Sequence, residues 1–155
     1  MGRQFVNTYL PRHARKGTKT IDLHSAVIGT GGITVADSAT TTIPIVSPYV
    51  RGYVDSLSMR GDTAAISASG TVLVTIYKWD AANAAAVALN TAVSIEAAGL
   101  TALKNVLPIT VLSSLTDVQR TKLEADTFYA EVVTTNTVGT APVRVQLCVT
   151  LAQTR

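Results

Sequence analysis

The 155-residue chain has little charge, few aromatic side chains and a single cysteine. Charged residues make up 15% of it, whereas soluble domains average about 25%. A surface that is rich in Thr, Ser, Ala and Asn in place of charged residues is typical of a protein that packs against others. It is equally typical of an ordinary β-domain, because Thr favours strands. The lone Cys148 excludes an internal disulfide, so we expect packing or assembly to provide stability.

No stretch predicts a secretory leader or a membrane span. The N-terminus has no apolar core region, and Val6 stands where acylation of Gly2 would require Ser or Thr. No uncharged run reaches the roughly 18 apolar residues that a membrane helix needs. We therefore expect no contact with a membrane.

What the chain does have is β-strand sequence, organised around the stretch TVLVTIYKW at Thr71–Trp79. Val72, Val74 and Ile76 fall on one side of an extended chain, and Leu73, Tyr77 and Trp79 on the other. Apolar residues on both sides predict a central strand that is covered on two faces. With 47% hydrophobic residues, we expect a core with this strand and the only tryptophan at its middle.

Shorter strand patterns surround this stretch. Extended segments are predicted at 20–24, 33–35, 40–46, 50–59, 86–95 and 109–112, and Pro44 places the segment 40–46 at a sheet edge or a bulge. Ser114 followed by Asp117 predicts a capped helical turn or two before Lys122, with Leu115, Val118 and Leu123 as its apolar stripe.

The C-terminal part shows the clearest alternation. Phe128, Ala130 and Val132 share one face of a strand over 127–134. Five apolar residues alternate with polar ones over 143–151 (Val143, Val145, Leu147, Val149 and Leu151), which predicts a half-buried antiparallel strand with a firmly specified register. The polar stretch 136–140 between them predicts a hairpin loop. About eight such strands predict an all-β fold, an antiparallel β-sandwich of the jelly-roll type spanning residues 21–155.

Residues 1–20 differ from the rest and predict an extended basic N-terminal arm. They carry five positive charges and no acidic residue, whereas residues 21–155 hold eight Lys or Arg and ten Asp or Glu. Such a segment buries too little apolar surface to fold alone. Its charged and apolar side chains are our candidate partner-binding residues: Arg3, Phe5, Tyr9, Leu10, Arg12, Arg15, Lys16 and Lys19. Their expected partner is a protein lattice or, less in keeping with the low density of Arg and Lys, nucleic acid. The alternative is a solvated tail that binds nothing.

Two short motifs have plainer explanations than function. Gly29-Thr30-Gly31-Gly32 lacks the Lys-Ser/Thr and the helix that a phosphate loop requires, so we interpret it as a turn. Arg60-Gly61-Asp62 matches a cell-attachment tripeptide, but a glycine between two charged residues is common in β-turns, so we interpret it as a turn.

The residues able to do chemistry are scattered in the sequence. His13 and His24 lack the short-spaced partners of a metal site, and Cys148 has no base near it in sequence. The carboxylates of Glu124, Asp126 and Glu131 cluster, but without the spacing of a calcium loop or of a sugar hydrolase. We expect no enzyme, no cofactor and no metal, and we interpret the three carboxylates as solvated loop charges.

The order of the segments resembles a known class of proteins. The segments that carry the resemblance are Val50-Arg51-Gly52-Tyr53-Val54, the strand from Gly70 to Lys78, the turn 115–123, Phe128-Tyr129-Ala130-Glu131-Val132 and the closing strand 143–151. In this order they resemble the small jelly-roll virion proteins of tailed bacteriophages, of the capsid decoration (cement) or head-fibre base type. The chain has Ala125-Asp126 where the resemblance implies Gly-Asp. The resemblance implies a homotrimer that binds the lattice of the major capsid protein.

We therefore expect a virion structural protein, made in the host cytoplasm and placed on the capsid surface, that stabilises a phage capsid. A receptor-binding or carbohydrate-binding (lectin-like) virion module is the alternative, although eight aromatic residues provide few platforms for sugars. A coat protein that faces nucleic acid is a third hypothesis.

Overall fold

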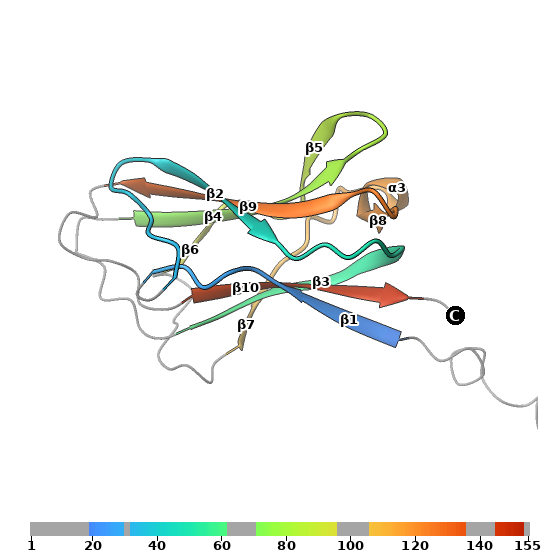
Figure 1. The fold of residues 1–155 in the computed structure, drawn as a ribbon, viewed down its shortest axis with the longest axis horizontal. Helices are drawn as coiled ribbons and strands as arrows, with labels where there is room; N and C mark the ends of the chain where they lie inside the picture. Colours follow the sequence, from blue (N-terminus) through green and yellow to red (C-terminus); the bar gives the residue numbers. More distant parts are fainter. Residues whose placement is uncertain (1–18, 30–31, 62–70, 96–105, 136–144, 154–155) are drawn as a thin grey trace, which may run out of the picture.

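The computed structural model describes residues 19–29, 32–61, 71–95, 106–135 and 145–153. These residues form two antiparallel sheets that pack face to face (Figure 1). The elements are β1 (Lys19–His24), β2 (Thr40–Ile45), β3 (Gly52–Gly61), β4 (Thr71–Asp80), β5 (Ala85–Ala88), β6 (Val93–Ser94), β7 (Val106–Ile109), α3 (Asp117–Arg120), β8 (Thr121–Lys122), β9 (Thr127–Thr135) and β10 (Val145–Gln153).

The two sheets take their strands from all parts of the chain. Sheet A has the order β1-β10-β3-β7, with β8 also paired to β3; sheet B has the order β2-β9-β4-β5, with β6 also paired to β4. The all-β antiparallel sandwich expected from the sequence is confirmed. Its core lies between the sheets, where the inward residues of β10 (Val145, Leu147, Val149 and Leu151) meet those of β4 and β9 in one buried cluster.

Strand β4 is central in its sheet, as expected, but it is not covered on both faces. Val72, Val74 and Ile76 are fully buried, whereas the outward side chains are only partly so, and Trp79 is 39% exposed. The expectation that the tryptophan lies in the core is therefore wrong. Position 79 falls on the outward side of the strand, and the core position beside it is taken by Lys78, which is 2% exposed.

The two C-terminal strands do not form the predicted hairpin. The inward faces of β9 and β10 are as the alternation indicated, but β9 pairs with β2 and β4 whereas β10 pairs with β1 and β3. The chain thus crosses from one sheet to the other between them. Alternation specifies which side of a strand is buried, and it carries no information about which strand lies beside it.

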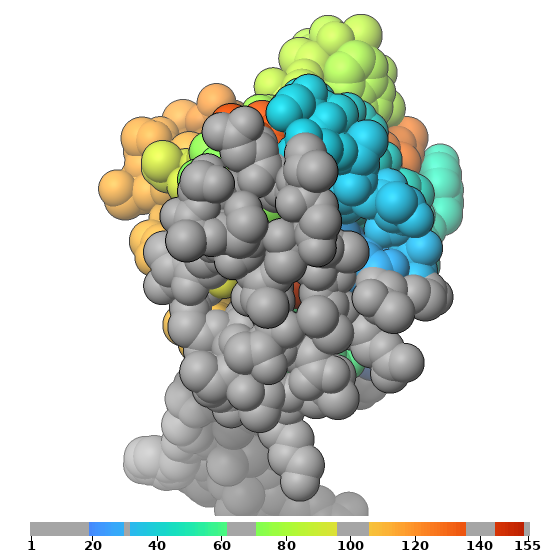
Figure 2. Space-filling model, turned by 90° about the vertical axis from the view of Figure 1, so that its left-hand side faces the viewer, coloured from blue at the N-terminus to red at the C-terminus, as the bar shows by residue number. Residues whose placement is uncertain are grey.

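A hairpin occurs instead between β4 and β5, across an alanine-rich stretch. Asp80 accepts hydrogen bonds at its Oδ1 atom from the backbone N–H groups of Ala82 and Asn83, both at 3.0 Å, and Ala84 has a φ of 49°. An aspartate that bonds the backbone two and three residues on is a turn former. The hairpin projects from the molecule at the top of Figure 2.

The strand predicted near 86–95 is real but broken in two. β5 and β6 both pair with β4, and Asn90 lies in the gap between them. Its side chain completes the ladder: Ile76 N–H donates to Asn90 Oδ1 at 2.7 Å, and Asn90 Nδ2 donates to the carbonyl oxygens of Val74 and Thr91 at 3.2 and 2.7 Å.

The predicted helical turn exists but begins later than Ser114. Thr116 is the N-cap of α3, and it forms a reciprocal capping box with Gln119. The predicted apolar stripe is wrong for two of its members, because Val118 and Leu123 are exposed. Three apolar residues in a single turn are too few to specify a buried face.

Three other expectations concern edges and turns. Among the described strands, β2, which contains Pro44, pairs with β9 only, apart from one bridge between Ile45 and Ser25. It is therefore an edge strand, one of the two alternatives that Pro44 predicted. Arg60 and Gly61 are not a turn: they are the last residues of β3, paired with Gln146 and Val145, while Asp62 lies outside the described residues. Gly29 and Gly32 do form a turn; Gly29 has a φ of 99°, and a Cβ on Gly32 would collide with the Val27 carbonyl.

The proposed arm lies outside the described residues except for its last two. Lys19 and Thr20 begin β1 and pair with Gln153 and Ala152, so these two residues belong to a strand of sheet A. Within the described ranges, no helix has the length and the hydropathy needed to cross a bilayer.

Candidate functional site

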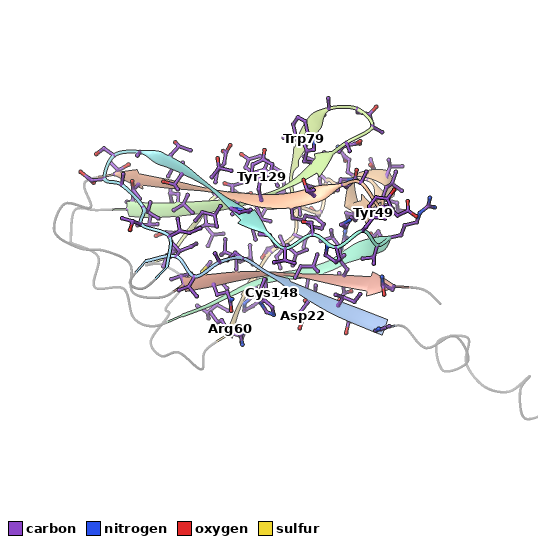
Figure 3. The ribbon with its side chains drawn as sticks, viewed as in Figure 1. Asp22, Tyr49, Arg60, Trp79, Tyr129 and Cys148 are labelled. Carbon is purple, nitrogen blue, oxygen red and sulfur yellow. The ribbon has the colours of Figure 1, made fainter. Side chains whose placement is uncertain are left out.

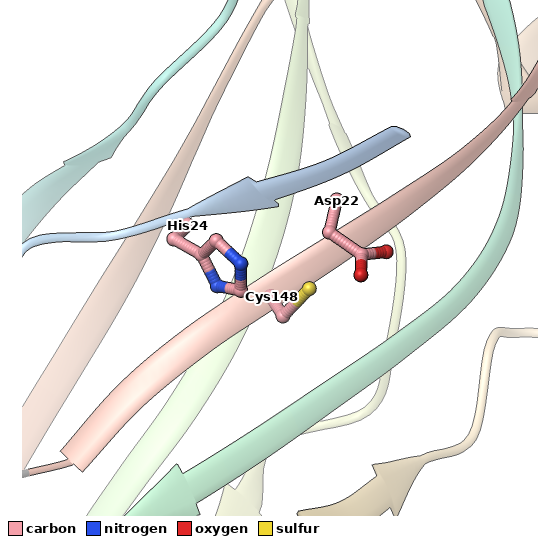
Figure 4. A group of neighbouring side chains, drawn as sticks. All are labelled: Asp22, His24 and Cys148. Atoms are coloured by element: carbon pink, nitrogen blue, oxygen red, sulfur yellow. The ribbon is translucent and has the colours of Figure 1, made fainter. Parts of the chain in front are cut away.

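The outer face of sheet A brings together Asp22, His24 and Cys148. Their side-chain oxygen, nitrogen and sulfur atoms all lie within 4.8 Å of one another. Figure 4 shows the thiol between the imidazole and the carboxylate, and Figure 3 shows Asp22 and Cys148 on the side of sheet A that faces away from sheet B.

Strand geometry explains this cluster. Asp22 and His24 are two residues apart on β1, so they point to the same face, while Leu23 between them points into the core. Cys148 is directly opposite His24 on β10, and Thr150 is opposite Asp22. The same two rows continue onto β3 with Ser58 and Ser56.

Hydrogen bonds hold part of the cluster in place and leave part of it unsatisfied. Thr150 Oγ1 donates to Asp22 Oδ1 at 2.7 Å, and it lies 4.0 Å from Cys148 Sγ. The Nδ1 atom of His24 is buried and has no hydrogen-bond partner within the described part of the chain. A buried polar atom without a partner is costly and calls for an explanation.

The three side chains open onto a pocket of ≈ 350 Å³. Its other walls come from β3 and β7, and include Ser56, Ser58, Arg60 and Pro108. The Arg60 guanidinium also bonds Gln146 Oε1 at 3.3 Å. The face therefore combines a thiol, an imidazole, a carboxylate, hydroxyl groups and one guanidinium beside a cavity.

The cysteine in this cluster is not an activated nucleophile. Burial raises the pKa of the Cys148 thiol, and the nearby Asp22 carboxylate raises it further, while side-chain hydrogen bonds with Thr150 and Ser58 and the Arg60 charge act in the opposite direction. The net shift is upward, so the thiol stays protonated at neutral pH. Because the thiolate is the reactive form, the arrangement does not favour covalent catalysis.

Sheet B presents an outer face of opposite character. The outward residues of β2, β9 and β4 include a single charged side chain, Glu131; the full set is Thr40, Thr42, Pro44, Thr127, Tyr129, Glu131, Val133, Thr135, Thr71, Leu73, Thr75, Tyr77 and Trp79. We call these residues the outer face of sheet B.

Aromatic rings gather on this face. Tyr77 and Tyr129 are paired across β4 and β9, and their rings stack with centroids 5.2 Å apart and planes 11° from parallel. Trp79 follows Tyr77 on the same side of β4, and Figure 3 shows it and Tyr129 on the side away from sheet A. Burial and the Glu131 carboxylate raise the pKa of both tyrosines. Aromatic area that is exposed beside so little charge is typical of a contact surface.

The three carboxylates grouped by the sequence do not converge in space. Glu124 pairs with Arg51 at 2.7 Å on the surface, and Glu131 lies on the outer face of sheet B. Asp126 is buried, and its oxygens accept from the backbone N–H groups of Ala81 and Leu123. The interpretation as solvated loop charges is therefore wrong for Asp126, which fixes the start of β9.

The sequence patterns did not reveal the Asp22, His24 and Cys148 cluster, because Cys148 is far from the other two residues along the chain. The spacing Asp-x-His on a predicted strand was the one available indication, since it places both side chains on one face. His13, the other histidine, and the arm candidates Arg3, Phe5, Tyr9, Leu10, Arg12, Arg15 and Lys16 lie outside the described residues. Lys19 lies on the exposed first position of β1.

Comparisons with known proteins leave the chain without a family assignment. No protein-family model, no curated protein and no solved structure matches it. The arrangement of residues in the fold is therefore the basis for a functional proposal.

Proposed function

We propose that this chain is a virion structural protein, a decoration or cement protein that associates with copies of itself and stabilises a phage capsid lattice. The observation that carries the proposal is the difference between the two outer faces. The outer face of sheet B is nearly uncharged and consists mainly of threonine, aromatic and aliphatic side chains, whereas that of sheet A carries Asp22, His24 and Arg60 beside a pocket.

A sandwich with one such face is suited to assembly. Val133 and Trp79 are 38% and 39% exposed, and burying apolar area of this kind contributes about 25 cal/mol per Å². Fixed pairing within the sheet makes the face a rigid platform, so little conformational entropy is lost when a second copy docks there. A homotrimer, which the phage resemblance implies, is the assembly we propose.

The basic arm provides the second contact. Residues 1–18 carry four of the five positive charges of the arm, and they precede β1 at the edge of sheet A. Ordering such a segment costs roughly 1–2 kcal/mol per residue. Apolar anchors such as Phe5 and Tyr9, together with charge-assisted hydrogen bonds to the lattice, would have to exceed that cost.

A binding experiment tests the proposal. The full chain, added to purified capsid shells that lack both the protein and the genome, should sediment with the shells and saturate. Deletion of residues 1–18 should abolish this binding and leave the melting temperature within a few degrees, because the described strands already close a continuous buried core among themselves. Failure of the folded full chain to bind shells would overturn the proposal.

The second candidate, a carbohydrate-binding module, is favoured by Trp79 with Tyr77 and Tyr129 on one face. The stack argues against it in part, since each tyrosine ring covers one face of the other, and sugars dock on open ring faces. Specific signals on a glycan array that disappear in Trp79→Ala would favour this module over the capsid protein. A steep loss of nucleic-acid affinity with salt would instead favour the nucleic-acid-facing coat protein.

A further inference from the structure

Asp22, His24 and Cys148 are the one group of three or more metal-ligating side chains that come together in the described ranges. They offer one sulfur, one nitrogen and one oxygen donor. Thiolate and imidazole ligands suit borderline transition metals, and calcium or magnesium would require mostly oxygen ligands. The donor set therefore selects for an ion such as Zn²⁺.

The spacing fits a single ion. Zinc takes ligands at about 2.0–2.3 Å in tetrahedral geometry, which places ligand atoms about 3.5 Å apart. The three donor atoms lie within 4.8 Å of one another. A rotation of the exposed Asp22 side chain and a shift of about an ångström would close the difference, and the backbone pairing of β1 with β10 need not change.

Two independent features of the surroundings point to an ion. His24 Nδ1 is buried without a hydrogen-bond partner in the described structure, and a metal would take its lone pair. Thr150 donates to Asp22 Oδ1 at 2.7 Å, which is the kind of contact that orients a carboxylate ligand from the second layer of residues.

We propose that Asp22, His24 and Cys148 bind one divalent transition-metal ion of the zinc type, with a fourth coordination position open to water in the pocket beside β3 and β7. On binding, the Cys148 S–H bond breaks, the proton goes to solvent, and a sulfur–metal bond forms. The thiolate and the carboxylate together balance the charge of the ion.

Such an ion would tie β1 to the rest of the sandwich. β1 is an edge strand whose one partner among the described strands is β10, and the ligands come from these two strands. The metal would act as a cross-link between them, so the free energy of binding would add to the stability of the folded state. The site does not depend on the capsid proposal, because its ligands lie on sheet A and not on the outer face of sheet B.

The test uses the full chain, kept reduced with a phosphine and titrated with Co²⁺. We expect one Co²⁺ per chain, a thiolate-to-cobalt charge-transfer band, displacement of Co²⁺ by Zn²⁺, and a higher melting temperature with either ion. Cys148→Ser and Cys148→Ala should each remove the band. His24→Gln and Asp22→Asn should each weaken Co²⁺ binding at least tenfold.

Two further variants separate ligands from bystanders. Thr150→Val should weaken binding by about 10-fold, as expected for the loss of an orienting contact. Asp55→Asn, which removes an exposed carboxylate of β3 that does not line the pocket, should bind within twofold of the parent chain. The proposal is overturned if the folded parent chain shows no thiolate band, or if His24→Gln binds as tightly as the parent, since the ion would then use other ligands.

Discussion

Lys78 Nζ lies 3.9 Å from Asp126 Oδ2 in the interior of the protein, and the two side chains are 2% and 3% exposed. The ammonium group also donates to the carbonyl oxygens of Val118 and Thr121 at 3.2 and 2.7 Å. Lys78 thus joins β4 to the segment that holds α3 and β8, and Asp126 holds the start of β9 next to it.

Breaking this pair should be strongly destabilising. Lys78→Met removes the ion-pair partner of the buried Asp126 carboxylate and the donor from two carbonyl groups, so the free energy of unfolding should fall by about 3–5 kcal/mol. Urea denaturation of the parent and the variant measures this loss of stability. In a double-mutant cycle with Asp126→Asn, the two losses should not add; additive losses would show that the pair is not coupled.

Asn90 should be more important to sheet B than its polar character indicates. Asn90→Ala leaves the Ile76 N–H and the Val74 carbonyl without the partners that the side chain provides, both in a buried position. The free energy of unfolding should fall by about 1–3 kcal/mol. The exposed Asn83→Ala serves as the control and should cost less, because water can replace its hydrogen bond to Asp80. Equal losses in thermal unfolding would contradict this role.

Cys148 should make the protein less stable in alkali. The folded state raises the pKa of the thiol, so it binds a proton that the unfolded chain releases at its usual, lower pKa. This contribution to stability is fully present below the unfolded pKa and is lost as pH rises through the folded pKa. Cys148→Ser lacks it.

Urea unfolding with a chelator present, from pH 7 to pH 10.5, measures the difference between the two chains. The parent should lose stability relative to Cys148→Ser above about pH 8.5, the ordinary pKa of a thiol. Tyr77, Tyr129 and Lys122 titrate in both chains, so their effects cancel in the comparison. A difference that does not vary with pH would contradict the prediction.

The outer face of sheet B should control self-association. Val133→Lys places a charge in the middle of this face, opposite Leu73 on β4, and we expect it to shift the proposed trimer toward monomer in light scattering at micromolar concentration. Val118→Lys on α3 is a matched control, since Val118 is also exposed but lies away from the face. A parent chain that stays monomeric would exclude the assembly itself.

The positive charges of the arm should contribute to attachment in a salt-dependent way. Replacing Arg12, Arg15 and Lys16 together with Ala should weaken binding to capsid shells more at low salt than at high salt, because screening already removes the long-range attraction at high salt. Sedimentation of the chain with shells at two ionic strengths measures this. A loss that is the same at both would assign these residues a role other than electrostatic attraction.

Much of the fold followed from local pattern. Alternation in β9 and β10 predicted which side chains face the core, Pro44 predicted an edge strand, and the overall β-content predicted a sandwich. The predictions of burial succeed because the side chains of a strand point alternately to its two faces, so the order of apolar and polar residues indicates which face is buried. The low charge and the basic arm were also properties of the sequence alone.

What the sequence by itself determined, then, was the side of each strand that is buried; the tertiary structure decided which strands are neighbours. Pairing of β9 with β4, and of β10 with β1, depends on hydrogen bonds between segments distant in the chain, and no local pattern encodes them. For that reason Cys148 looked isolated until β10 placed it opposite His24 and beside Asp22. Lys78 occupies the core position beside the exposed Trp79 for the same reason, since only the folded chain brings its buried partner Asp126 close to it.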